Sequence, residues 1–339
     1  MSESSFLAAC AGKSAAHIPV WYMRQAGRCL PEYRVLKEHY DILTLARTPE
    51  LATRITLMPV HRFGVDAAIL FADIMLPLIG MGVDLDIVES VGPVIADPIR
   101  NAKSVEKIRS LDPADFEYLR KTIVMIRTEL AGKLPLIGFS GAPFTLASYL
   151  IEGKPSRNFI KTKQLMYGDR DVWNKLMEKL TDAVIEYLQL QLDAGVDAIQ
   201  LFDSWVGCLS KEDYVEYVLP YTRRVFTAVS KRGIPRIHFG TNTAAFLEEF
   251  ASVDCEVVGV DWRLPLEDAW ERIGAGKAIQ GNLDPVMLLG DFDIVKKKVD
   301  DIFSHLPRKQ GFVFNLGHGV LPDTPYANLI KLTEYVHGK

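Results

Sequence analysis

The chain has 339 residues, of which 48% are hydrophobic and 24% are charged, as in an ordinary globular protein with a sizeable core. Its formal net charge of −4 argues against a nucleic-acid or anionic-membrane partner, because both kinds of binding need a basic surplus. No run reaches the roughly 18 apolar residues of a membrane span, and no basic leader opens the sequence. The four cysteines form no Cys-x-x-Cys pair, so we expect reduced thiols and a cytoplasmic protein.

Short apolar or β-branched runs alternate with longer segments of helical spacing along the whole chain. The pattern predicts eight strands, near residues 19–23, 67–71, 135–140, 198–203, 235–239, 257–261, 277–281 and 312–316. The clearest helices between them cover residues 49–63, 114–130, 171–193, 211–232 and 294–305. Such alternation is typical of a parallel sheet, and eight units close naturally into a TIM-type (β/α)8 barrel. No Pro/Gly/Ser-rich linker divides the chain, so we predict a single barrel domain over residues 1–339.

Residues 82–95 interrupt the alternation after the second predicted strand. Apolar and acidic residues alternate in Val83-Asp84-Leu85-Asp86-Ile87-Val88, and a turn and a second apolar run follow. This pattern predicts an inserted β-hairpin. Beside the barrel mouth it would form a rim or a lid.

A basic stretch follows the first predicted strand. Arg24, Arg28, Arg34 and Lys37 stand there against one acid, Glu32. A guanidinium offers five donors in a planar fork that suits carboxylate or phosphate, so several on one loop predict a receptor for a polyanion. The alternative is a solvated basic loop, in which Arg34 pairs with Glu32 or faces solvent.

Polar residues also lie at or beyond the ends of later strands, at the face that carries the active site in enzymes of this architecture. Four of them are candidate site residues: Asp73, Tyr149, Ser204 and His318. Each has an ordinary structural interpretation as well. Asp73 and Ser204 could cap helices, Tyr149 could belong to the core face of its helix, and His318 could be a packed loop histidine.

A nucleotide site has no support in the sequence. Gly274-Ala275-Gly276-Lys277 suggests a phosphate loop, but the Walker pattern needs glycine and Ser or Thr where Glu271 and Ala278 stand. The glycine-rich run at Gly317 does not continue as a dinucleotide fingerprint either, because Pro322 occupies its last position.

Several long motifs resemble one family. Met23-Arg24-Gln25-Ala26-Gly27-Arg28, continued by Pro31-Glu32-Tyr33-Arg34, resembles the N-terminal signature of the uroporphyrinogen decarboxylase family. Further segments resemble the same family, so that the resemblance runs from Pro19 to about Thr324: Phe71-Ala72-Asp73, Gly141-Ala142-Pro143-Phe144-Thr145 with Tyr149, Phe202-Asp203-Ser204-Trp205 and Asn315-Leu316-Gly317-His318-Gly319. Cys29 and Lys37 depart from it, since an aromatic or small polar residue and an arginine are common at these positions.

The resemblance implies a carboxy-lyase of haem biosynthesis that uses no cofactor and no metal. Its substrate, uroporphyrinogen III, carries eight carboxylates, and four acetate side chains become methyl groups to give coproporphyrinogen III. Arg24, Arg28 and Lys37 are implied as cations for the carboxylates. Asp73 is implied as the acceptor of the pyrrole N–H groups and the counter-charge of a cationic intermediate.

The same resemblance implies substrate binding by Tyr149, Ser204 and His318, and a homodimer. Asp73, Arg28 and Arg24 are the candidate catalytic residues. The route of the proton stays open, because arginine is a poor acid.

Two alternatives remain. Corrinoid-dependent and methionine-forming methyltransferases share this barrel and hold zinc through His-x-Cys and a later Cys. In His238-Phe239-Gly240 a glycine replaces that thiolate, and Cys255 alone cannot complete a zinc site. The other alternative is a tetrapyrrole carrier without catalysis.

Overall fold

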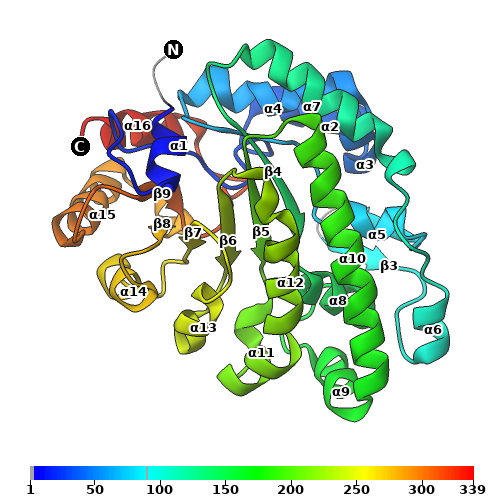
Figure 1. The fold of residues 1–339 in the computed structure, drawn as a ribbon. Coiled ribbons are helices and arrows are strands. Elements are labelled where there is room, and N and C mark those ends of the chain that lie inside the picture. Colours follow the sequence, from blue (N-terminus) through cyan, green and yellow to red (C-terminus); the bar gives the residue numbers. More distant parts are fainter. Residues whose placement is uncertain (1–3, 89–90) are drawn as a thin grey trace.

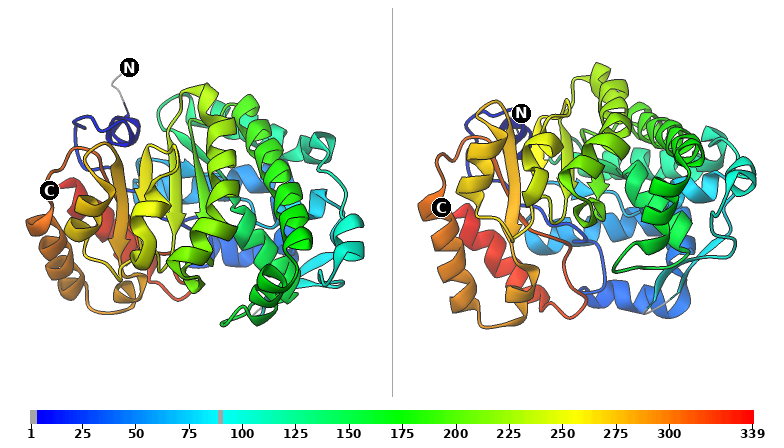
Figure 2. Two further views of the ribbon diagram at one scale, coloured as in Figure 1. Left: turned by 60° about the horizontal axis from the view of Figure 1, so that its bottom comes forward. Right: turned by 90° about the horizontal axis from the view of Figure 1, so that it is seen from below.

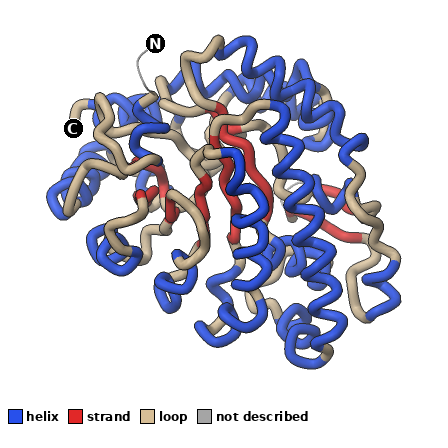
Figure 3. Tube along the Cα trace, viewed as in Figure 1, coloured by secondary structure: helices blue, strands red, loops and turns tan. Residues whose placement is uncertain are grey.

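A curled parallel sheet lies at the centre of the molecule, and helices cover its outer side (Figures 1 and 3). This computed structural model describes residues 4–88 and 91–339. The sheet contains β1 (Ala68–Ile69), β4 (Leu136–Gly141), β5 (Ala198–Asp203), β6 (Arg236–Gly240), β7 (Val257–Gly259), β8 (Ala278–Leu283) and β9 (Phe312–Leu316). Neighbouring strands follow this order, and every pair is parallel. The predicted α/β barrel class is confirmed.

The helices follow the strands in chain order. They are α1 (Ser5–Cys10), α2 (Pro31–His39), α3 (Ile42–Arg47), α4 (Pro49–Phe63), α5 (Leu76–Gly80), α6 (Ala102–Glu106), α7 (Glu117–Leu130), α8 (Pro143–Glu152), α9 (Ile160–Gly168), α10 (Arg170–Ala194), α11 (Lys211–Tyr217), α12 (Leu219–Val229), α13 (Leu247–Ala251), α14 (Leu266–Ile273), α15 (Phe292–His305) and α16 (Tyr326–His337). Within the described ranges, no helix is both long and apolar enough to cross a bilayer.

The prediction of eight strands is wrong for the first one. Among the described residues, 19–23 pair with the sheet through a single bridge, from Val20 to Phe314 of β9. The segment nevertheless closes the ring. On one side the Phe314 N–H donates to the Pro19 carbonyl at 2.9 Å, and on the other the Asp66 N–H donates to the Val20 carbonyl at 2.8 Å.

Side chains replace the missing ladder at this place. The N–H of Tyr22 donates to Gln25 Oε1 at 3.0 Å, and the N–H of Met23 donates to Asn315 Oδ1 at 3.2 Å. The amide nitrogen of Gln25 in turn donates to the Ala67 carbonyl at 3.0 Å. The backbone groups are satisfied, but the pattern is no longer that of a strand.

Two antiparallel strands lie between β1 and β4 in the chain. These strands, β2 (Leu85–Val88) and β3 (Gly92–Ile95), place Leu85 opposite Ile95. They fall where the sequence predicts an inserted hairpin, and residues 89–90 between them lie outside the described residues.

One predicted helix is divided. Residues 211–232 form α11, α12 and a short 3₁₀ turn at Ser230–Arg232. Pro220 lies at the start of α12, where it lacks a donor for the preceding turn and disfavours helical geometry in the residue before it. The other four predicted helices are confirmed, with residues 113–116 forming a 3₁₀ turn ahead of α7.

Two helix-to-strand corners share the sequence Gly-Val-Asp-Ala. The glycine of each is left-handed, with φ of 66° and 103°, which ends the helix at little steric cost. The aspartate of each accepts a bond from the backbone at the start of the neighbouring extended segment: 2.7 Å from Val20 N to Asp66 and 2.8 Å from Leu136 N to Asp197. The repeated sequence therefore performs the same structural task twice.

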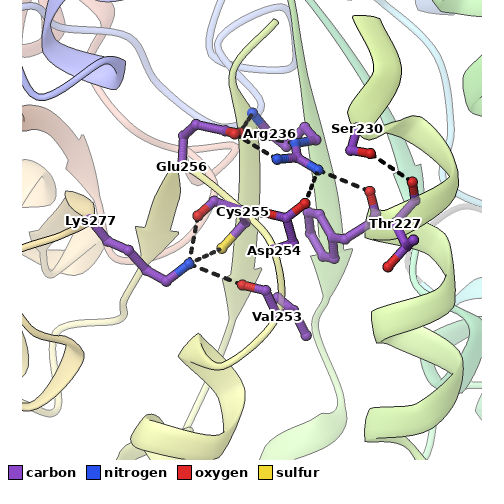
Figure 4. A network of polar contacts seen from close by, with 9 residues as sticks. Thr227, Ser230, Arg236, Val253, Asp254, Cys255, Glu256 and Lys277 are labelled. Atoms are coloured by element: carbon purple, nitrogen blue, oxygen red, sulfur yellow. Dashed lines mark hydrogen bonds and ion pairs between the residues drawn. The ribbon is translucent and has the colours of Figure 1, made fainter. Parts of the chain in front are cut away.

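Charged networks stabilise the N-terminal end of the barrel. Arg236, 5% exposed at the start of β6, donates to both oxygens of Glu256 at 2.6 and 3.0 Å and to Asp254 at 3.0 Å (Figure 4). Lys277 donates to the Cys255 carbonyl at 2.6 Å. These bonds fix the loop before β7, so this end of the barrel is built for stability.

Candidate active site

A cavity of about 310 Å³ opens at the C-terminal ends of the strands, the end of the barrel that faces the viewer in the right panel of Figure 2. Its size is within the range of small-molecule sites. Five of the seven predicted site residues line it: Arg24, Arg28, Asp73, Ser204 and His318. Two others, Lys37 and Tyr149, are not among the described residues that line it.

Three phenylalanines form one wall of the cavity. Phe139, Phe202 and Phe239 come from β4, β5 and β6. The ring centroids lie 5.5 and 5.9 Å apart, and His318 continues the row 6.4 Å from Phe239. The sequence analysis missed these residues. The signal was available, because each stands one or two residues before the end of an alternating strand.

The first loop holds two arginines at the mouth. Arg24 adopts a left-handed backbone with φ of 61°, which is uncommon for a residue with a side chain and marks an overdetermined position. Its side chain passes over Gly319, where a Cβ would stand 2.5 Å from Arg24 Cδ. The glycine therefore makes room for the arginine. Arg28 is exposed and lines the same cavity.

Arg34 does not behave as expected. It neither pairs with Glu32 nor simply faces solvent. Its Nε donates to the Arg28 carbonyl at 2.6 Å and its Nη2 to the Pro322 carbonyl at 3.0 Å, while Glu32 pairs with Arg62. Arg34 thus ties the arginine loop to the loop that follows β9.

Asp73 lies directly beyond β1 and is half-buried. Its Oδ1 accepts the Met75 N–H at 2.8 Å, and no protein donor to Oδ2 occurs among the described residues. Burial raises the pKa of Asp73, and the Met75 N–H and the Arg24 charge partly offset that rise. The helix-cap interpretation fails, because α5 begins at Leu76 with Met75 at its cap.

His318 lies in the loop after β9, half-buried against the cavity. Burial lowers the pKa of His318 to about 4, and the charges of Arg24 and Arg263 add to this effect. Its imidazole is therefore neutral near pH 7 and offers one donor and one acceptor.

The remaining predicted residues differ in their places. Ser204 lines the cavity, and the 3₁₀ turn that follows has Trp205 at its cap, so the cap interpretation of Ser204 is wrong. Tyr149 is half-buried with its ring 5.9 Å from that of Trp205. Burial and the nearby Asp73 charge raise the pKa of Tyr149 to about 12, which keeps the phenol protonated. Lys37 is half-buried on α2.

Two polar residues near strand ends do not reach the mouth. Asp203 and His238 are fully buried. Thr145 Oγ1 donates to Asp203 at 3.2 Å, and the His238 ring stacks on Phe250 at 3.6 Å. Both side chains are held between the sheet and its helices, so His238 cannot serve as a ligand in the cavity.

One group of described residues has the composition of a metal site: His17, Asp66 and His337. The imidazole Nε2 atoms lie 2.6 and 2.8 Å from the Asp66 oxygens, which is hydrogen-bond distance. The group joins the two ends of the chain, which lie side by side in Figures 1 and 2. It precedes the strands, away from the mouth.

The fold and the cavity define a class: a parallel α/β barrel that receives an anionic small molecule at the C-terminal ends of its strands. Comparison with known structures supports the fold. A methyltransferase from Methanosarcina mazei superposes with a TM-score of 0.82 at 18% identity, covering 98% of this chain and 97% of its own. A B12-independent methionine synthase from Shewanella gives 0.54 at 13% identity, covering 86% and 88%.

Sequence comparison gives the family. The family model described as "Uroporphyrinogen decarboxylase (URO-D)" matches residues 1–339. Curated uroporphyrinogen decarboxylases from Streptomyces coelicolor and Thermobifida fusca are 51% and 50% identical, and each alignment covers 99% of this chain and 94% or 93% of the relative. The chain belongs to the uroporphyrinogen decarboxylase family.

Proposed function

We propose that this protein removes CO2 from the four acetate side chains of uroporphyrinogen III and releases coproporphyrinogen III. One observation carries the proposal: a single carboxylate, Asp73, lies in a cavity whose rim carries Arg24 and Arg28. A macrocycle with N–H groups at its centre and carboxylates at its edge is complementary to that arrangement of charge. The family relationship supports the same reaction.

The chemistry needs an electron sink. Loss of CO2 from a pyrrole acetate leaves an electron pair on the exocyclic carbon. Protonation of the adjacent ring carbon first makes a cationic ring that accepts this pair as the C–C bond breaks. A second proton then forms the methyl group, and the ring proton is lost, so each cycle consumes one proton and releases one CO2.

Asp73 is placed to assist this step. Its Oδ1 is held by the Met75 N–H, and Oδ2 is available to the pyrrole N–H groups. A fixed carboxylate beneath the ring stabilises the positive charge as it develops, and it needs little reorganisation to do so.

The other predicted residues take binding roles in this proposal. Arg24, Arg28 and Lys37 neutralise side-chain carboxylates, and Arg28 orients the reacting one. Neutral His318 and the protonated phenol of Tyr149 each offer a donor to a carboxylate, and Ser204 adds a hydroxyl at the mouth. No metal or cofactor takes part.

We also propose a cytoplasmic homodimer of single-domain subunits. Apolar side chains are exposed on both flanks of the cavity: Val35 (54%) on α2 and Val88 (40%) on the hairpin. Pairing of two mouths would bury them. Sedimentation that shows a monomer at working concentration would remove this proposal.

The reaction itself is tested by product analysis. Purified protein is incubated with uroporphyrinogen under strictly reducing conditions, and the porphyrinogens are oxidised and separated by chromatography. We expect species with seven, six and five carboxylates, followed by coproporphyrinogen. A carrier would return the substrate unchanged, and methyl transfer would give products of higher carboxylate count or altered mass.

Arg34→Ala is expected to raise KM roughly fivefold with little change in kcat. The reason is that Arg34 holds the Arg28 carbonyl, and loss of a charged donor in a half-exposed site costs about 1 kcal/mol. Steady-state assays at several substrate concentrations measure the effect. Arg62→Ala, which breaks the neighbouring pair with Glu32, is the control, and equal KM values in both variants contradict the assigned role.

His318 should titrate with a midpoint near 4, as measured by NMR of labelled imidazole with His318→Asn to assign the signal. Since the ordinary value is about 6.5, the unfolded chain binds this proton more tightly than the folded one. His318 therefore makes the free energy of unfolding rise with pH between about 4 and 6.5. A midpoint near 6.5 speaks against a neutral, desolvated imidazole at the mouth.

A further inference from the structure

We propose that Arg263 is an additional substrate-binding residue that receives one carboxylate side chain of the macrocycle beside His318. This inference rests on the proposed function and extends it to a residue that none of the sequence motifs indicated.

The turn that carries Arg263 lies just beyond the C-terminal end of β7, on the side of the barrel that holds the cavity. It packs against the loop after β9. A Cβ on Gly317 would stand only 2.6 Å from the Trp262 backbone nitrogen. Gly317 directly precedes His318, which lines the cavity. Arg263 therefore lies next to the mouth.

This turn is firmly held. Asp261, 5% exposed, accepts the backbone N–H of Arg263 at 3.0 Å and that of Asn242 at 2.6 Å. Asn282 donates to the carbonyls of Asp261 and Leu264 at 2.9 and 2.7 Å. A binding group on such a turn loses little conformational freedom when the ligand arrives.

The guanidinium of Arg263 is fixed but only partly used. Its Nη1 donates to Asp261 Oδ2 at 2.6 Å, and its carbon lies 4.3 Å from the centroid of the Trp262 ring. The side chain is 45% exposed. No acceptor for Nε or Nη2 occurs among the described residues. A guanidinium has five donors, so an edge remains free for an incoming carboxylate.

The charge of the ligand provides a reason for another cation. Uroporphyrinogen carries eight carboxylates, whereas the cationic side chains among the described residues that line the cavity are Arg24 and Arg28. Asp261 is not a full counter-charge at the surface, because it is buried and two backbone N–H groups share its charge. The Arg263 charge also reaches the cavity, since it helps to lower the pKa of His318.

The test compares Arg263→Gln with Arg272→Gln. Arg272 is the matched control, because it is partly exposed, pairs with Glu248 through two 2.6 Å bonds, and lies on α14 of the same β7–β8 connection. With uroporphyrinogen as substrate, we expect Arg263→Gln to raise KM about tenfold with kcat within twofold of wild type. Binding of the product, coproporphyrinogen, should weaken in parallel. Arg272→Gln should leave both unchanged.

Three further outcomes decide the matter. Added salt should raise KM less steeply in Arg263→Gln than in wild type, because one ionic contact is gone. An unchanged KM in folded Arg263→Gln overturns the inference, and so does a loss of kcat with unchanged product binding. If Arg263→Gln does not fold, Arg263→Lys replaces it. A KM between those of wild type and an uncharged site supports the inference, and failure of Arg263→Lys to fold shows that the residue serves the structure alone.

Failure of the inference is distinct from failure of the proposed function. A wild-type protein that leaves uroporphyrinogen unchanged refutes the function before any variant is made. A wild-type protein that works, with Arg263→Gln identical to it, refutes the role of Arg263 alone.

Discussion

Asp73→Asn is expected to lower the turnover of uroporphyrinogen roughly 100-fold or more, a loss typical of a preorganised charge removed from an active site. Binding of coproporphyrinogen should weaken far less, because the carboxylate stabilises the cationic intermediate more strongly than the neutral ring. Single-turnover rates and product affinity measured on the same preparation separate the two effects.

A matched control and an alternative accompany this prediction. Asp182→Asn removes an exposed carboxylate that pairs with Arg224 and should leave turnover unchanged. If Asp73 only shapes its turn, asparagine would do this about as well, and near-normal turnover in a folded Asp73→Asn variant would falsify the mechanism.

The same residue predicts a pH dependence. Burial raises the pKa of Asp73, so the ionised form is lost at a higher pH than for an ordinary carboxyl group, whose value is about 3.9. Turnover should be complete above the raised pKa and should decline as the pH falls through it. This limb should be absent from the residual activity of Asp73→Asn.

The second large effect is expected at the two arginines of the first loop. Arg24→Ala and Arg28→Ala should each raise KM between tenfold and 100-fold, because each removes a charge-assisted bond to a carboxylate worth about 1.5–3 kcal/mol. Arg28→Ala should also lower kcat if Arg28 orients the reacting acetate. Initial rates over a range of substrate concentrations give both constants.

Arg224→Ala is the control for these variants, because Arg224 is about as exposed as an ordinary surface arginine and its partner Asp182 lies on α10. Small and equal changes at Arg24, Arg28 and Arg224 would mean that the loop carries only solvated charge. The solvated-loop interpretation would then replace the receptor.

The fold was largely predictable, because apolar runs and helical periodicity reflect burial directly. The first strand was not. Residues 19–23 have the composition of a strand, yet Gln25 and Asn315 bond the N–H groups of Tyr22 and Met23. Side chains that replace a ladder leave no periodic signal. The break at Pro220 was a local signal that the helical periodicity around it concealed.

The site was predictable where a motif places its residue on the cavity, as for Asp73 and Ser204. It was not predictable where direction decides. Asp203 precedes Ser204 directly but is buried against Thr145, because successive strand residues point to opposite faces. Arg34 looked like another rim cation, and only tertiary contacts show that it holds Arg28 and the loop after β9.

The most direct test of the account asks whether the side chains of this chain suffice for the reaction. Protein freed of metal by chelation and gel filtration is incubated anaerobically with uroporphyrinogen, and the CO2 released is counted against the coproporphyrinogen formed. We predict four CO2 per macrocycle at the rate of untreated protein. Loss of CO2 release on metal removal, with recovery when zinc is added, would contradict the central claim.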